Sequence, residues 1–199
     1  MASARYNAEI SAGSLMPLES KRIAQLLLSS PDTQAWIDAI EKQNILQKKT
    51  IATARRQATL IRKRLDTLEP LAWQMIASRE SEVVNQLLLA AAVKHSQLLG
   101  DFMKLVYALR QRKLELDLSV CDWEDFLIEC AHHDPALAQW SESTKLKLFQ
   151  VVVRMLVESK FLEDSKSLKL TPPALHPDVW RYLHLHKESY VIDCLERTQ

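Results

Sequence analysis

Residues 50–68 read TIATARRQATLIRKRLDTL, and this stretch predicts the fold class. Its apolar residues recur at alternating spacings of three and four, which places them on one face of an α-helix. These residues are Ile51, Ala54, Ala58, Ile61, Leu65 and Leu68. We therefore expect one amphipathic helix here.

The remaining sequence also favours helices. Only two of the 199 residues are glycine, Gly13 and Gly100. Sheet proteins with tight hairpins usually need more, because glycine supplies the positive φ angles of those turns. The seven prolines lie mostly where helices should begin or end, as Pro17 does. With 47% hydrophobic residues to form a core, we expect an all-α, compact multi-helix globular protein.

A loose stretch at 114–120 predicts a boundary between two helical lobes, residues 1–113 and 121–199. The first lobe contains a helix, a polar turn and the basic helix, which together form a helix-turn-helix-like segment at 36–68. In the second lobe, helices precede two short apolar pieces at 161–170. This order is that of a winged helix, so we expect a small β-hairpin there as the wing.

The most apolar part of the chain, Val83–Val93, predicts a buried core helix. It is too short for a membrane span, which needs about 18 apolar residues. Ser81 is expected to cap this helix, which continues to about Leu99. Gly100 is expected to end it, before another helix begins at Asp101.

The cysteines indicate a reducing compartment. There are three, Cys121, Cys130 and Cys194, and an odd, sparse count argues against a disulfide framework. The N-terminus lacks a charged region followed by an apolar stretch, which makes a signal peptide unexpected. We therefore expect a cytoplasmic protein with no membrane partner.

The charges are unevenly distributed. Residues 42–65 contain eight Lys or Arg side chains and no Asp or Glu, whereas the remaining residues carry 18 basic and 25 acidic side chains. Such a segment is typical of a protein with a polyanionic partner. The candidate nucleic-acid-binding residues are Lys48, Lys49, Thr50, Arg55, Arg56, Arg62, Lys63 and Arg64.

The helical spacing places most of these cations together. Arg55 and Arg62 are seven residues apart, as are Arg56 and Lys63, so all four lie roughly opposite the apolar face. Lys48 and Lys49 either extend these rows or lie in a turn before the helix. An ordinary solvated helix face would usually mix positive and negative side chains, and this one does not. The pattern favours a surface for double-stranded DNA.

Thr50 has two compatible roles, as the N-cap of the basic helix or as a phosphate contact, and the cap is the more common one.

In the second lobe, Lys145, Lys147 and Arg154 suggest a further contact surface. Acidic residues lie close to them in the sequence, so a mixed solvated face is the better interpretation there.

Nothing in the sequence calls for a metal, a cofactor or catalysis. His132 and His133 are adjacent, and His184 and His186 are two apart, so neither pair shares a helical face. The acidic residues after Cys121 fit a helix N-terminus, where carboxylates complement the dipole. Two glycines exclude a glycine-rich phosphate loop, and no nucleophile elbow or zinc-protease motif occurs. We expect no enzymatic activity, no cofactor and no metal.

Several stretches resemble the BrxA family. They are Tyr6–Leu15, Glu19–Ala24, Asn44–Thr50 with Arg64-Leu65, Trp140–Thr144 and Arg154–Leu156. BrxA proteins are small components of BREX, the bacteriophage exclusion systems of bacteria. The resemblance implies an all-helical protein with helix-turn-helix-like parts and some likeness to the antitermination factor NusB. It also implies DNA binding without a known enzymatic activity, and other BREX subunits as partners. The family offers no established catalytic residues to carry over.

The functional prediction is a non-catalytic DNA-binding accessory protein that contacts the duplex backbone through the basic helix. Two alternatives remain open. A protein-interaction adaptor would dock the basic helix on other defence subunits, and an exposed apolar patch would favour it. An RNA-binding, NusB-like factor is weakened by the lack of aromatic side chains in the basic segment. No heptad pattern runs beyond one helix, so we expect a monomer.

Overall fold

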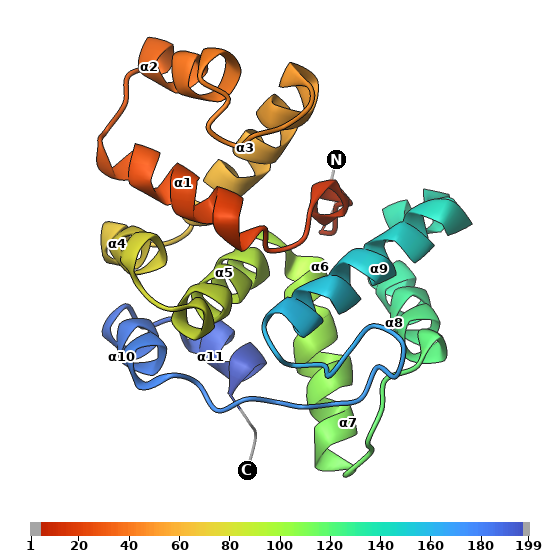
Figure 1. Ribbon diagram of the computed structural model, residues 1–199. Coiled ribbons are helices and arrows are strands. Elements are labelled where there is room, and N and C mark those ends of the chain that lie inside the picture. Colours follow the sequence, from red (N-terminus) through yellow and green to blue (C-terminus); the bar gives the residue numbers. More distant parts are fainter. Residues whose placement is uncertain (1–4, 197–199) are drawn as a thin grey trace.

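The computed structural model describes residues 5–196, which form helices joined by turns, with no β-sheet among them (Figure 1). The all-α prediction is confirmed. The α-helices are α1 (Pro17–Leu28), α2 (Thr33–Ile37), α3 (Ile51–Leu65), α4 (Pro70–Ser78), α5 (Ser81–His95), α6 (Gln97–Phe102), α7 (Ala108–Arg112), α8 (Val120–His133), α9 (Glu142–Glu158), α10 (Pro177–Leu185) and α11 (Ser189–Leu195). Short 3-10 or π-helical turns are η1 (Glu9–Ala12), η2 (Asp38–Lys42), η3 (Met103–Tyr107) and η4 (Pro135–Gln139).

Helix α5 lies at the centre of the fold, surrounded by other helices (Figure 1). Ten of its fifteen residues are buried, all of them between Val83 and Val93. Helices that contact it are α1, α3, α4, α6, α9, α10 and α11. A helix that is hydrophobic all round is expected to be buried all round. The prediction of a buried core helix at Val83–Val93 is confirmed.

Two polar side chains of α5 form hydrogen bonds with the backbone of the C-terminal half of the chain. The side-chain amide of Gln86 donates to the carbonyl oxygen of Ala174 (3.1 Å) and accepts from the amide of His176 (2.8 Å). The side-chain amide of the neighbouring Asn85 donates to the carbonyl of Glu158 at the end of α9 (2.7 Å). Since most buried polar groups in proteins are hydrogen-bonded, these contacts fix where the segment before α10 and the end of α9 meet α5.

The expected helix end at Gly100 was wrong. Helix α5 ends at His95, and Ser96 then adopts an extended backbone conformation and caps α6, which contains Gly100. A β-carbon on Gly100 would lie 2.1 Å from the phenol oxygen of Tyr190 in α11. Glycine is therefore required by the close approach of α11 and not by a helix end.

The two apolar pieces expected as a hairpin do pair, but only through isolated bridges. Leu162 and Leu170 form one antiparallel bridge, with Glu163 donating to the carbonyl of Lys169 (2.9 Å). On its other side, residues 168–170 pair with residues 116–118, where Leu118 donates to the carbonyl of Leu168 (3.0 Å). The chain order of short segment, α8, α9 and paired segments is compatible with a winged helix, which stays a prediction.

The hydrophobic core is continuous across the expected lobe boundary at 114–120. One cluster of buried side chains includes residues from both sides of this stretch. Moreover, α10 and α11 contact α5, so the C-terminal helices pack on the N-terminal half. The division into two lobes stays a prediction. None of the described helices is long and apolar enough to cross a membrane.

We expect Gly100→Ala to lower the free energy of unfolding by about 1–3 kcal/mol, because the added methyl group displaces Tyr190. Urea unfolding of the single variants and of Gly100→Ala with Tyr190→Ala measures the coupling. The double variant should lose less stability than the sum of the two single losses. Strictly additive losses would contradict a contact between these positions.

Candidate nucleic-acid interface

Thr50 begins the basic helix α3. Its backbone is extended (φ −133°), and its hydroxyl accepts a hydrogen bond from the amide of Thr53 (3.2 Å). Thr50 is therefore the N-cap, as expected from its residue type. Lys48 and Lys49 consequently lie in the turn before α3, which settles the alternative that the sequence left open.

The turn before α3 is held in place by local hydrogen bonds. The side-chain amide of Asn44 donates to the carbonyl of Lys48 and accepts from its backbone amide, both at 2.9 Å. The ammonium group of Lys48 forms an ion pair with Glu19 of α1. Lys49 next to it is exposed and forms no ion pair within residues 5–196.

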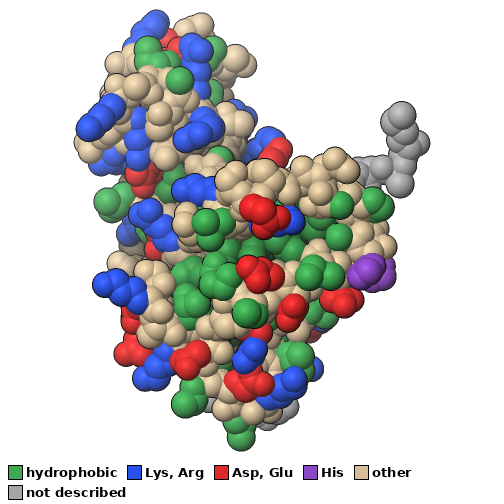
Figure 2. All heavy atoms as spheres, turned by 90° about the vertical axis from the view of Figure 1, so that its right-hand side faces the viewer, with side chains coloured by type: hydrophobic (Ala, Val, Ile, Leu, Met, Phe, Trp, Pro, Cys, Tyr) green, Lys and Arg blue, Asp and Glu red, His purple; other side chains and the backbone are tan. Residues whose placement is uncertain are grey.

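The spacing predicted most of the buried face of α3, but Ile51, which it also placed on that face, is 54% exposed. Ala54, Ala58, Ile61 and Leu65 are buried, and the helix packs on α1 and α5. The opposite face exposes the side chains of Arg55, Arg56, Arg62 and Lys63. We call these four residues and Lys49 the α3 basic surface. Figure 2 shows Lys and Arg side chains spread over the upper part of the molecule, where Figure 1 places α2 and α3.

Acidic residues from outside the basic segment pair with part of this surface. The guanidinium of Arg55 donates to both carboxylate oxygens of Glu41, each at 2.6 Å. This pairing lowers the pKa of the Glu41 carboxyl. Lys63 contacts Glu9 of η1 at 2.9 Å. The charge of the segment is thus partly compensated by acids that lie elsewhere in the sequence.

Arg62 and Arg56 differ in how firmly they are held. The Arg62 guanidinium lies 4.6 Å from the ring centre of Trp36 and 3.7 Å from the carboxylate of Asp66. Stacking on tryptophan orients a guanidinium without removing its charge. Arg56 is exposed and, within the described part of the chain, forms no ion pair. Arg56 and Lys49 are therefore the cations most available to a phosphate.

Arg64 is not on the surface. Its side chain is buried and donates to the carbonyl oxygens of Ser14 (2.5 Å) and Gly13 (3.0 Å). Burial lowers its pKa to about 10. Although the sequence placed Arg64 among the DNA-binding candidates, the structure gives it a different task, which is to fix the N-terminal segment to α3.

The second candidate surface, on α9, is a mixed one. Lys145 pairs with Glu142 (2.8 Å), and Arg154 pairs with Glu158 (3.2 Å). This arrangement matches the solvated face that we preferred from the sequence. Within residues 5–196, no three His, Cys, Asp or Glu side chains come together as a metal site would require.

Comparison with known proteins identifies the family. The model of the BrxA family matches residues 4–187. The chain belongs to the BrxA family. Family membership implies a role in phage defence, and the resemblance noted in the sequence is confirmed.

The relatives cover the chain almost completely. A BREX protein BrxA from Paramagnetospirillum magneticum (strain ATCC 700264 / AMB-1) is 41% identical over 98% of both chains. A BREX protein BrxA from Escherichia coli O9:H4 (strain HS) is 33% identical over 94% of this chain and 88% of its own. A crystal structure of an uncharacterized protein from Magnetospirillum magneticum superimposes with a TM-score of 0.91 at 40% identity, covering 98% of this chain and all of that one.

We expect Arg64→Met to lower the free energy of unfolding by about 1–3 kcal/mol, because the buried carbonyl of Ser14 and the partly buried carbonyl of Gly13 lose their donor. Urea unfolding measures this loss. Arg56→Met is the matched control on the same helix and should change stability by less than about 0.5 kcal/mol. Equal losses in the two variants would contradict the structural role of Arg64.

His95 should make the protein less stable in mild acid. Burial and the nearby charge of Arg64 lower the pKa of His95, while Glu9 at 3.3 Å offsets part of this effect. An unfolded histidine has a pKa of about 6.5, so below this pH the unfolded chain takes up a proton at this position more readily than the folded protein does. Stability contributed by neutral His95 is therefore lost as the pH falls from about 6.5 towards the folded pKa.

Urea unfolding at pH 7.5 and 5.5 tests this expectation with His95→Gln. The wild type should lose more stability between these two pH values than the glutamine variant, which has no group titrating at this position. The same loss in both proteins would show that His95 does not contribute to the acid dependence.

Proposed function

We propose that this chain is a non-catalytic DNA-binding accessory protein of a BREX phage-defence system, and that the α3 basic surface contacts the backbone of the duplex. One observation supports this above others. Helix α3 exposes four cations opposite its buried face and carries no acidic residue. A row of this kind matches the phosphates of DNA, which supply the sequence-independent part of binding.

The ion pairs that Arg55 and Lys63 make do not oppose this role. Both pairs are exposed, and exposed salt bridges contribute little to stability because water and salt screen them. A phosphate oxygen offers the same guanidinium or ammonium group an equivalent acceptor, and the release of counterions from DNA favours the exchange. Lys49 and Arg56 form no ion pair in the described chain, so they can contact a phosphate without first losing a carboxylate partner.

The local architecture supports helix-turn-helix-like docking with one difference. The residues 33–42 form one helical rod through α2 and η2, and α3 follows after the turn at 43–50. This turn is longer than the three to four residues of the usual motif. We infer that α3 approaches the duplex with its N-terminal half and that Lys49, Arg55 and Arg56 neutralise phosphates. Contacts of this kind carry no sequence information, so binding is expected to tolerate many sequences.

Double-stranded DNA fits the surface better than RNA. Helix α3 contains no aromatic residue, and Trp36 beside it is already stacked on Arg62. Single-stranded RNA is usually bound through exposed aromatic side chains on which bases stack. We propose that the chain acts as a monomer in the cytoplasm, without a cofactor, together with other BREX subunits.

We expect the variant Arg55→Glu, Arg56→Glu, Arg62→Glu, Lys63→Glu to bind duplex DNA much more weakly than wild type. Fluorescence anisotropy with a labelled duplex, titrated across salt, measures affinity. The slope of log K against log salt should flatten by about 0.9 for each phosphate that the variant no longer neutralises. Circular dichroism establishes that the variant is folded.

The control carries the same change in net charge at other exposed positions: Arg79→Glu, Arg112→Glu, Lys166→Glu and Arg181→Glu. It should keep the wild-type salt slope. If wild type and both variants bind alike, DNA contacts lie elsewhere on the chain. If wild type does not bind, the proposal fails and the alternative of a protein-interaction adaptor is favoured.

A further inference from the structure

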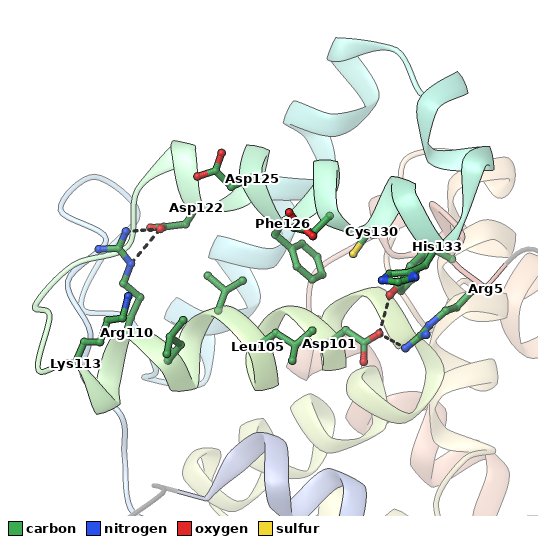
Figure 3. A pocket seen from close by; sticks show the side chains of 14 residues that line it. Arg5, Asp101, Leu105, Arg110, Lys113, Asp122, Asp125, Phe126, Cys130 and His133 are labelled. Carbon is green, nitrogen blue, oxygen red and sulfur yellow. Dashed lines mark hydrogen bonds and ion pairs between the residues drawn. The ribbon is translucent and has the colours of Figure 1, made fainter.

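A groove runs between α8 on one side and η3 with α7 on the other (Figure 3). Its volume is about 550 Å³, in the range of ligand-binding clefts. Val106, Phe126 and Cys130 line it, and Leu105 and Leu109 form one wall. This groove is far from α3 in the chain and uses none of the α3 basic surface.

One wall of this groove exposes two large apolar side chains. The side chains of Leu105 and Leu109 are 58% and 44% exposed. Seven of the fourteen exposed large hydrophobic residues in the described chain lie between residues 105 and 146, and five of these seven line this groove or the one on the other side of α8. Exposed apolar side chains that gather on one surface are typical of an interaction site.

Ion pairs close both ends of the groove. At one end Asp101 accepts from Arg5 (2.8 Å) and from the Tyr6 hydroxyl (2.8 Å), and at the other Arg110 pairs with Asp122 (Figure 3). These charges are satisfied within the molecule. The apolar part of the groove between these two ion pairs is therefore already formed without a partner.

The lip of the groove on α8 is acidic. Helix α8 contains four acidic residues and no Lys or Arg. Among the described residues, Asp125 and Glu129 on this lip form no ion pair, whereas Asp122 is used by Arg110. Lys113 at one end is the only lining cation without an ion pair in the described chain. Such a lip attracts a basic partner and repels phosphate.

The opposite side of α8 has the same character. A second groove, about 640 Å³, lies between α8, η4 and α9, with Ile128 and Leu146 exposed and Glu124 on its edge. Figure 2 shows hydrophobic and acidic side chains together over the middle and lower part of the side on which Figure 1 places α8 and α9. Helix α8 is thus an acidic ridge between apolar grooves, on a face separate from the cations above it.

We propose that the groove between α7 and α8 binds a basic amphipathic helix of another protein of the same defence system. Leu105 and Leu109 are four residues apart, as are Asp125 and Glu129, so both walls repeat once per helical turn. A docked helix with apolar residues at this spacing contacts the leucines and Phe126. Its Lys or Arg side chains pair with the two free carboxylates.

The dimensions and charges favour this occupant over two others. The wall from Asp101 to Lys113 extends about 18 Å, which is the length of three helical turns. A second copy of the chain does not offer its basic helix α3, because the apolar face of α3 is buried on α1 and α5. Nucleic acid is excluded by the carboxylates of the lip.

The test places a photo-crosslinking amino acid at position 105 of the full-length chain, in cells that carry the whole BREX gene set. The control has the same group at Leu18 of α1, which is 72% exposed and outside both grooves. Mass spectrometry identifies the crosslinked peptide. We expect at least tenfold more adduct at position 105, to a segment of another BREX subunit with apolar residues at helical spacing and flanking Lys or Arg.

Charge reversal makes the test specific. Asp125→Lys with Glu129→Lys should reduce this adduct at least tenfold, and Lys→Glu changes in the crosslinked segment should restore it. The same variant should still bind duplex DNA, so failure here is separate from failure of the proposed function. An adduct to a second copy, to nucleic acid, or insensitive to charge reversal overturns the proposal. A yield of adduct at position 105 that does not exceed the yield at position 18 also overturns the proposal.

Discussion

The burial of α5 on every side is the constraint on which the other helices depend. Seven helices contact it, and its run of Ala90, Ala91 and Ala92 is fully buried, so neighbouring backbones can approach closely. Water is excluded from Val83–Val93, so a polar side chain there is stabilised by a partner in the protein. Gln86 and the amide nitrogen of Asn85 bind the backbone of the C-terminal half, so one helix orders segments 73 to 90 residues away, although the Asn85 Oδ1 has no partner among the described residues.

The parts of the fold that local spacing determines could be predicted from the sequence. The faces of α3, the cap at Thr50 and the buried run in α5 all follow from residues within a few turns of one another. The task of Arg64 was missed, although a signal was present. Leu60 lies one turn before it and is also buried, so the buried face is wider than the apolar repeat alone indicates. A guanidinium at the edge of that face has the reach to bind carbonyls of another segment.

Tertiary contacts explain what the sequence could not provide. Glu9 is 54 residues from Lys63 and Glu41 is 14 from Arg55, so counting charges along the chain overstated the free charge of the basic segment. Gly100 looked like a helix end because that is the commonest use of glycine near a helix terminus. Its true role depends on where Tyr190, 90 residues later, meets α6. The apolar grooves beside the acidic ridge of α8 could not be predicted either, since the hydrophobic residues of α7, α8 and α9 also fit ordinary core helices.

The segment around Gly13 and Ser14 has a mechanical consequence. Arg64 of α3 holds its carbonyls, while Glu158 at the end of α9 accepts from the Ser14 hydroxyl and the Leu15 amide, both at 2.8 Å. The segment Gly13–Leu15 therefore connects α3 and α9 by hydrogen bonds and holds these two helices at a fixed separation. Neither helix can turn alone without breaking these hydrogen bonds, of which the one from Arg64 to the Ser14 carbonyl is buried. A rigid partner that contacts both α3 and α9 would therefore always meet these two helices at the same separation.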